Sequence, residues 1–179
     1  MLRQPVVSGR FYESEAAALK NDVRQYLSGA VRRDGAVACL SPHAGYLYSG
    51  AIAGTVLGAM GPGQRYIILG PNHTGMGERY GVYPEGTWLT PLGKARIDEE
   101  LAGALLKESD LFSADTVCHM NEHSIEVQIP ILQVMDPGFS FVPVCITEGS
   151  PNELKRLGDA VARCVNGVKG GVKIIVSSD

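Results

Sequence analysis

The sequence predicts an α/β fold with one domain, in which helices flank a largely parallel or mixed central sheet. Two short apolar runs, residues 36–40 and 66–69, each end abruptly in a segment of Pro, His and Gly, as buried parallel strands do where they enter a functional loop. The chain has 179 residues and 45% hydrophobic content, which is enough for one substantial core and too little for two domains. We therefore expect residues 1–179 to form a single domain.

Helices are expected where apolar residues recur at helical spacing beside a capping signal. The clearest begins at Ser150-Pro151-Asn152-Glu153, which combines a capping box with proline at the first helical position. Pro130 should kink or break a helix over residues 122–135, because it lacks an amide hydrogen and clashes with the preceding turn. The other helices are predicted over residues 14–27 with Ser14 as N-cap, over residues 51–60 with Gly54 and Gly58 against the sheet, and from Asp98 as N-cap.

Two further strands are predicted in the second half of the chain. Residues 139–146 form an apolar run, but Pro143 cannot donate a ladder hydrogen bond and therefore favours an edge or a bulge. Residues 172–176 form an apolar strand that ends in Ser177-Ser178-Asp179, with the same strand-then-polar pattern as the two histidine segments. Ligands of open α/β sheets bind outside the carboxyl ends of the strands, so these polar ends should meet in one crevice.

Charge and cysteine usage narrow the partners and the compartment. The net charge of -3 and the pI near 5.8, with acids and bases interspersed, offer no basic face for nucleic acid or an anionic membrane. The four cysteines form no C-x-x-C pair, which favours buried free thiols in a reducing cytosol. No apolar run approaches the roughly 20 residues of a membrane span, and residues 1–5 lack the layout of a signal peptide. We expect a cytoplasmic protein that binds neither nucleic acid nor membrane, and a homo-oligomer stays open.

His43 and His73 are the central candidates for a metal site. Each follows a predicted strand, and neutral imidazoles at adjacent strand ends can bring lone pairs to a divalent cation at about 2.0 to 2.3 Å. Asp179 stands where a third strand would release a carboxylate toward the same crevice. Two histidines with one carboxylate are the facial ligand set of non-haem iron sites. The alternative is that each histidine only hydrogen-bonds its own loop.

Several blocks of the sequence, in the same order, resemble the Memo family. They are Pro42-His43-Ala44-Gly45-Tyr46, Gly70-Pro71-Asn72-His73, Glu122-His123-Ser124-Ile125-Glu126 and Ser177-Ser178-Asp179, and the match extends back to Gly9-Arg10-Phe11-Tyr12. That family is similar in fold to the class III extradiol dioxygenases, which use non-haem iron. The resemblance implies iron or copper at His43 and His73, with zinc as a further candidate.

The chain departs from the Memo pattern after Asp179. In that pattern another histidine follows the Ser-Ser-Asp segment and a metal-binding cysteine comes much later, and neither is present here. We therefore expect a C-terminally shortened member of the family. The third ligand of the dioxygenases is a glutamate that this resemblance does not reproduce, which weighs against ring cleavage.

His123 and Glu126 are the candidates for acid–base chemistry. Extradiol enzymes need a histidine near the metal that moves protons between substrate and bound oxygen, and the resemblance implies that role for His123. Glu126 would follow on the same helix face, where it could orient His123 or bind the metal. The alternative is a cluster that only caps and packs a helix. His119 beside Cys118 also combines two ligand types, but neighbours on a strand point to opposite faces, which favours an ordinary loop or core pair.

Three aromatic residues and one amide are assigned to a substrate pocket at the crevice. Aromatic faces there would stack on a flat ligand. The alternative is plain core or rim packing. The four residues are Tyr46, Tyr48, Asn72 and Trp88.

Three hypotheses for function follow. The first is a metal-binding, redox-capable protein related to the extradiol dioxygenases. The second is a non-enzymatic protein that binds a peptide or a small anion in the same crevice, as the resemblance to eukaryotic Memo, a phosphotyrosine-peptide binder, implies. The third is zinc-dependent hydrolysis, in which Glu126 would act as the base on a metal-bound water.

Overall fold

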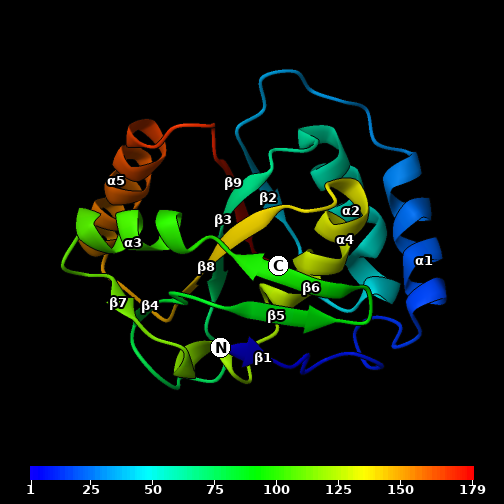
Figure 1. Cartoon of the computed structure of the whole chain (residues 1–179), viewed down its shortest axis with the longest axis horizontal. Helices are drawn as coiled ribbons and strands as arrows, with labels where there is room; N and C mark the ends of the chain where they lie inside the picture. Colours follow the sequence, from blue (N-terminus) through cyan, green and yellow to red (C-terminus); the bar gives the residue numbers. More distant parts are fainter.

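A mixed sheet of nine strands runs through the molecule (Figure 1). The strands of this computed structural model, which describes residues 1–179, are β1 (Leu2–Arg3), β2 (Ala38–Ser41), β3 (Arg65–Pro71), β4 (Tyr80–Val82), β5 (Thr87–Thr90), β6 (Gly93–Ile97), β7 (Ser113–Ala114), β8 (Ser140–Ile146) and β9 (Lys173–Ser177). The main path has the order β1-β5-β6-β8-β3-β9-β2, and β4 pairs with β8 and β7. The pairs β5–β6 and β4–β8 are antiparallel, and the others are parallel.

Helices cover both faces of this sheet, which confirms the predicted α/β fold (Figure 1). They are α1 (Ala16–Ser28), α2 (Tyr46–Met60), α3 (Glu99–Glu108), α4 (Ile129–Met135) and α5 (Pro151–Gly167), with the 3-10 turns η1 (Val117–His119) and η2 (Glu126–Gln128). α1, α2 and α4 share one buried core with the sheet, and α3 and α5 share the other. β3 serves both cores, because Tyr66 and Ile68 alternate with Ile67 along the strand. None of the helices has the length and apolar character that a membrane crossing requires.

α2 begins at Tyr46, earlier than the predicted start at residue 51. Gly54 and Gly58 pack against α1. The sequence had placed them against the sheet. A Cβ at Gly54 would lie 2.4 Å from the Cβ of Tyr26 in α1, and Gly58 meets the end of α1 in the same way. The missing side chains therefore let the two helices approach closely.

β8 lies in the interior of the sheet, although Pro143 suggested an edge. In a β-strand, the backbone N and O atoms of one residue point toward the same neighbouring strand. The Pro143 carbonyl accepts a hydrogen bond from the Tyr83 backbone N–H, so the Pro143 nitrogen faces that side of β8 as well. On that side of β8, the last residue of β6 lies opposite Phe141, and the last residue of the antiparallel β4 lies opposite Val144. The missing N–H of Pro143 falls in the gap between these two strands, so no ladder hydrogen bond is lost.

The sequence predicts a helix over residues 122–135 with a kink or break at Pro130, but the α-helix in this region begins only at Ile129. η2 leads directly into α4, and Pro130 lies in the first turn of α4. A helix start leaves its first N–H groups unpaired in any case, so proline opens the helix there instead of breaking it. His123 precedes η2 and is not part of a helix.

The predicted helix caps are largely present. Ser150 and Glu153 form the capping box of α5, and Asp98 caps α3. α1 differs, because Glu15 and not Ser14 accepts the first free amide hydrogens of the helix. The difference is one residue, and it leaves the position of the helix unchanged.

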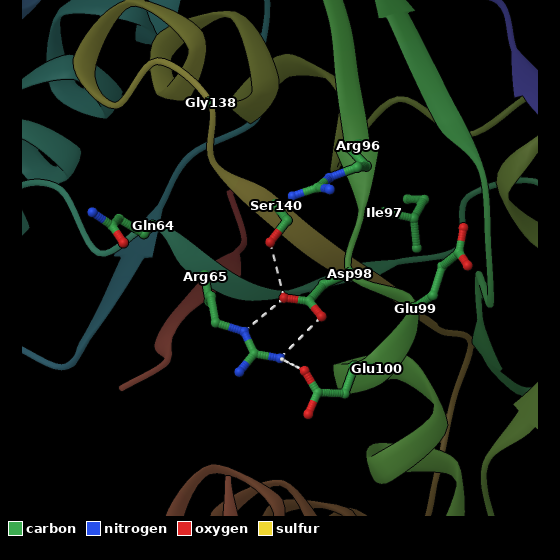
Figure 2. A pocket seen from close by; sticks show the side chains of 9 residues that line it. All are labelled: Gln64, Arg65, Arg96, Ile97, Asp98, Glu99, Glu100, Gly138 and Ser140. Atoms are coloured by element: carbon green, nitrogen blue, oxygen red, sulfur yellow. Dashed lines mark hydrogen bonds and ion pairs between the residues drawn. The ribbon is translucent and has the colours of Figure 1, made fainter. Parts of the chain in front are cut away.

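Asp98 also ties together the amino-terminal ends of β3 and β8 (Figure 2). Its carboxylate accepts two hydrogen bonds from the Arg65 guanidinium, at 2.7 and 3.0 Å, and one from the Ser140 hydroxyl at 2.9 Å. Burial opposes ionisation of Asp98, but the hydrogen bonds from Arg65, the Leu101 N–H and Ser140 outweigh it and hold the pKa below its usual value. These residues border an open polar cavity of about 610 Å³. It lies at the amino-terminal ends of β3 and β8, whereas the histidine segments follow the carboxyl-terminal ends of their strands.

We predict that Asp98→Asn destabilises the fold by about 1.5 to 3 kcal/mol at neutral pH. Asparagine still caps a helix, so the loss reports the charged hydrogen bonds to Arg65. The pKa of Asp98 is lower in the folded than in the unfolded chain. The stabilisation is therefore present above the unfolded pKa of roughly 3.9 and is lost as the pH falls through the folded pKa. Urea unfolding of both chains should show a difference that shrinks in strong acid.

Glu100→Gln is the matched control for this substitution. Glu100 also faces Arg65, at 3.4 Å, but its side chain is 84% exposed. We expect its loss to change the free energy of unfolding by less than about 0.5 kcal/mol. Equal effects of the two substitutions would contradict the role assigned to Asp98.

Candidate metal centre

Three adjacent strands end at one edge of the sheet and carry the polar segments picked out from the sequence. β9 lies between β3 and β2, and all three run parallel, so their carboxyl ends adjoin. His73 follows β3, His43 follows β2 and Asp179 follows β9. His123 reaches the same place from the segment between η1 and η2.

Three imidazole rings meet at this edge. The ring nitrogens of His43, His73 and His123 that could bind a metal lie within 4.8 Å of one another. The rings of His73 and His123 are stacked with centroids 4.7 Å apart, and His43 lies edge-on to both at 5.2 and 5.8 Å. The His43 side chain is 4% exposed and that of His73 is 45% exposed, so the cluster opens to solvent on one side. Imidazoles bind a metal such as zinc at about 2.0 to 2.1 Å, so nitrogens grouped in this way are candidates for one metal ion.

A chain of hydrogen bonds sets the tautomer of His43. The Ser177 hydroxyl donates to the Ser124 carbonyl at 2.6 Å and accepts from the Gln128 side-chain amide at 3.0 Å. The Ser41 hydroxyl donates to the Gln128 oxygen at 2.8 Å, which fixes the orientation of that amide. The only proton of Ser177 is therefore used, so His43 Nδ1, 3.1 Å away, carries a hydrogen and donates it to the Ser177 oxygen. Nε2 of the neutral His43 ring keeps a free lone pair.

Glu122 has the corresponding role for His73. Its carboxylate is 2% exposed and accepts the His73 Nδ1–H at 2.9 Å. It also accepts the backbone N–H groups of His123 and Ser124, at 2.7 and 2.8 Å, and lies 3.4 Å from His123 Nδ1. An ionised carboxylate can only accept, so the proton of His73 stays on Nδ1 and the lone pair on Nε2. One buried acid thus orients the ring of His73 and holds the backbone of His123, as outer carboxylates do for histidines that bind metals.

The pKa values of the site favour neutral rings beside an ionised acid. Burial lowers the pKa of His43, Asp179 opposes the shift, and the neighbouring His73 and His123 add to it. Burial also lowers the pKa of His123, against the charge of Glu122. Burial acts to raise the pKa of Glu122, but hydrogen bonds led by that from His73 outweigh it and hold this pKa below its usual value. At neutral pH, His43 and His123 are therefore in the protonation state that a metal ion requires.

Asp179 lies beside His43 at the open side of the cluster. Its Oδ1 accepts the His43 backbone N–H at 2.7 Å, and its Oδ2 lies 3.6 Å from His43 Nε2. The Asp179 side chain is 53% exposed. The structure therefore presents two candidates for a third donor, the carboxylate of Asp179 and the imidazole of His123.

Glu126 does not face the histidines, which corrects the role given to it from the sequence. Its carboxylate is 1% exposed and accepts hydrogen bonds from Arg3, from the Tyr12 hydroxyl and from two backbone N–H groups near the amino terminus. The helix face that it was expected to share with His123 is absent, because the chain turns before η2. Both oxygens of Glu126 are occupied, so zinc-dependent hydrolysis loses its expected base.

The four residues assigned to a substrate pocket do not gather around the histidines. Tyr46 is buried, and its hydroxyl donates to a backbone carbonyl of η2 at 2.7 Å. Trp88 is 1% exposed and lies under the guanidinium of Arg3, 4.0 Å from the ring centroid. Tyr48 is 81% exposed on the first turn of α2. Asn72 stabilises its own loop, where its side-chain oxygen accepts hydrogen bonds from the backbone N–H groups that follow. Core, rim and loop packing therefore account for all four.

Sequence reasoning missed the residues that orient the histidines and the ring that borders them. Glu122, Ser177 and Gln128 supply the hydrogen bonds described above, and Phe11 packs edge-on against His123 with centroids 4.8 Å apart. A signal for Glu122 was present, since it directly precedes His123 and carboxylates are common partners of metal-binding histidines. Ser177 belongs to the polar strand end that the sequence placed at the crevice, although no role was assigned to it, whereas Gln128 and Phe11 reach the site only through the fold.

Comparison with known proteins assigns the chain to a family. A family model described as Memo-like protein matches residues 3–179. The chain belongs to the Memo family. It is 40% identical to a MEMO1 family protein of Thermotoga neapolitana, in an alignment that covers 100% of the chain and 70% of that protein. MEMO1 family proteins of Methanobrevibacter smithii and Archaeoglobus fulgidus are both 36% identical, over 100% and 99% of the chain and 69% and 67% of their own lengths.

The matched region of this Memo-family chain includes every residue of the histidine cluster. The resemblance inferred from the sequence blocks is therefore confirmed. The names of the relatives specify no metal, ligand or reaction. The chemistry of the cluster has to be argued from its geometry.

Proposed function

We propose that this Memo-family protein binds a redox-active transition metal, iron or copper, at His43, His73 and a third donor. The observation that supports this most directly is the pair of fixed tautomers. Nδ1 of His43 faces Ser177 and Nδ1 of His73 faces Glu122, so both Nε2 atoms keep lone pairs. Histidines that bind metals characteristically donate their other ring N–H to partners of this kind. Loop stabilisation alone would not require three imidazoles within 4.8 Å of one another.

The donor atoms favour iron or copper over hard cations. Imidazole nitrogens suit iron, copper and zinc, whereas magnesium and calcium prefer sites made of oxygen. With Asp179 as third donor, His43 and His73 complete the facial set of non-haem iron sites, and with His123 they form a three-nitrogen set. When bound, such a metal would supply redox chemistry toward dioxygen or an oxidisable substrate.

The protein's own residues would orient the ligands and handle protons. Ser177 and Glu122 hold the rings of His43 and His73. When Asp179 completes the ligand set, His123 is free to hold or move a proton, because it stacks on His73 and its side chain is 23% exposed. A cavity of about 250 Å³ lies at the ends of β3, β8 and β9, and it shares Ser177 with the histidine cluster.

A non-enzymatic role in peptide or anion binding is the alternative use of this crevice. The charges weigh against it, because Glu122 and Asp179 bring carboxylates to the histidines and so favour a cation over an anion. The overall net charge of -3 likewise disfavours nucleic acid as a partner. All four cysteines are free thiols, which supports a location in the reducing cytoplasm as part of this proposal.

Metal content measured by mass spectrometry tests the proposal. The chain is purified without added metal, and iron, copper and zinc are counted per chain in the unmodified protein, in His43→Ala and in Tyr48→Ala. We expect stoichiometric iron or copper that is lost in His43→Ala and retained in Tyr48→Ala, whose exposed ring lies outside the cluster. Oxygen uptake with a catechol, before and after chelation, then tests the redox activity.

Three outcomes would count against the proposal. Stoichiometric zinc would retain the metal centre and overturn its redox assignment. Iron or copper without oxygen uptake would remove the catechol reaction. A chain free of metal that binds a phosphotyrosine peptide equally well with and without chelator would favour the binding-protein alternative.

A further inference from the structure

A second cluster of metal-binding side chains lies in the core. Cys118, His119 and Cys145 place two sulfurs and one imidazole nitrogen within 4.8 Å of one another, and all three residues are 0% exposed. The sequence argued against this grouping, because adjacent strand residues point to opposite faces. Cys118 and His119 lie instead in the 3-10 turn η1, and Cys145 lies opposite them on β8. The grouping exists only in the folded chain.

A backbone carbonyl sets the tautomer of His119. Its Nε2 lies 3.0 Å from the Gly81 oxygen, which can only accept, so Nε2 carries a hydrogen. In the neutral ring the lone pair is then on Nδ1, which lies 3.4 Å from Cys145 Sγ. Histidines that bind metals are oriented in the same way, by a hydrogen bond from the ring nitrogen that does not bind the metal.

Gly81 also makes room for the Cys118 thiol. A Cβ at Gly81 would lie 2.3 Å from Cys118 Sγ, so any other residue would displace the sulfur. Asp115 fixes the turn that carries the thiol, because its carboxylate accepts the backbone N–H groups of Val117 and Cys118 at 2.7 and 3.2 Å. Separate contacts therefore hold Cys118 and His119 in place within η1.

The thiol of Cys145 differs from an ordinary buried thiol. Its Sγ lies 3.4 Å from His119 Nδ1 and 3.5 Å from the Cys118 carbonyl oxygen, and both atoms can accept a hydrogen bond. Cys164, a buried residue of α5, has neither contact, and burial raises its pKa. The lone pair on His119 Nδ1 accepts the Cys145 S–H, and a bound metal would displace this proton.

We propose that Cys118, His119 and Cys145 bind Cu(I) as a structural ion inside the core. Two sulfurs and one imidazole are a soft, three-coordinate set, which suits this cation, whereas structural zinc sites take four ligands. Cysteines bind a metal as thiolates, so Cu(I) would be held by the thiolates of Cys118 and Cys145 and by the neutral imidazole of His119. Binding displaces the two thiol protons to solvent and consumes no oxidant or reductant. Because the ligands are closed to solvent, the ion enters while the chain folds or when η1 opens transiently.

Anaerobic titration of Cu(I) against a chromophoric chelator tests this site. The background chain carries His43→Ala and His73→Ala, so the histidine crevice contributes nothing to the signal. We expect it to bind one Cu(I) per chain, and we expect Cys145→Ser in that background to lower the affinity at least 100-fold, roughly the upper range for loss of an outer partner alone. Cys164→Ser is the matched control, since it removes a buried thiol outside the cluster and should leave the affinity unchanged.

X-ray absorption of the copper-loaded background chain keeps the test decisive where Cys145→Ser fails to fold. We expect sulfur neighbours around the copper, and a shell of nitrogen or oxygen alone would overturn the proposal. Equal losses in the two cysteine variants would overturn it as well. Displacement of Cu(I) by an equal concentration of Zn(II) would overturn the choice of cation. None of these outcomes depends on whether the histidine crevice binds iron or copper.

Discussion

Replacing His43 or His73 by alanine should abolish tight binding of iron or copper while the chain stays folded. Each substitution removes one of the two Nε2 lone pairs that the fold holds ready, so we expect a loss of more than about 100-fold in affinity for each. Both residues follow strands, and each loses about one hydrogen bond, which should cost less than roughly 2 kcal/mol of stability. Calorimetric titration with Fe(II) and with Cu(II), together with urea unfolding, measures both quantities.

Two further variants give this prediction its scale. Glu122→Gln keeps the size of the side chain but removes the charge that orients His73, and we expect it to lower the affinity about 10- to 100-fold. Tyr48→Ala removes a solvent-exposed ring and should change nothing. Unchanged affinity in either histidine variant would remove that residue from the metal centre. An equal loss in Tyr48→Ala would point to general damage to the fold.

Glu126→Ala should cost about 3 to 5 kcal/mol of stability, because it leaves a buried arginine without its counterion. Arg3 is 0% exposed, and its Nη1 donates to Glu126 at 2.8 Å. The Tyr12 hydroxyl, which donates to Glu126 at 2.7 Å, loses its acceptor in the same substitution. The total free energy of unfolding of a typical domain is only about 5 to 15 kcal/mol. The Glu126→Ala chain should therefore be largely unfolded, or close to unfolding, at 37 °C. Urea or thermal unfolding measures the loss.

The pair of Arg3 and Glu126 supports the metal centre from a distance, through further contacts of Arg3. Its guanidinium also donates to the backbone carbonyls of His119 and Glu122, at 2.8 and 2.6 Å, and so anchors the segment that leads to His123. In Glu126→Gln, which keeps the shape of the side chain, metal affinity of the folded fraction should therefore fall less than in His43→Ala. Glu13→Gln removes an exposed carboxylate and serves as the control. If Glu126→Gln lost metal binding without losing stability, Glu126 would have a direct role in the metal centre.

The parts of the fold that the sequence predicted correctly depend on local interactions. The capping box of Ser150 and Glu153 and the N-cap Asp98 act within one turn of their helices, so their residue types are readable from the chain alone. The same is true of the strand ends that release His43 and His73, where an apolar run changes to Pro, His and Gly. Parallel strands with adjoining carboxyl ends then bring these residues to one edge.

The two prolines show why local rules were insufficient for the rest. Proline lacks an N–H, and the cost depends on whether the fold places an acceptor opposite it. Pro143 faces the gap between β6 and β4, and Pro130 lies at a helix start, so neither loses a hydrogen bond. The sequence shows which donor is missing, but the location of the matching acceptor depends on segments that are remote in the chain.

The sequence alone indicated the α/β fold, the Memo family, the candidate ligands His43, His73 and Asp179, and His123 as a candidate for proton transfer. Only the tertiary structure decided which acid serves the histidines. Glu122 and Glu126 both flank His123 in the chain, yet Glu122 turns to the histidines while Glu126 pairs with Arg3 at the other end of the sequence. The physical reason is that a buried carboxylate must find donors, and the donors nearest to Glu126 come from the amino terminus, which folding alone brings to it.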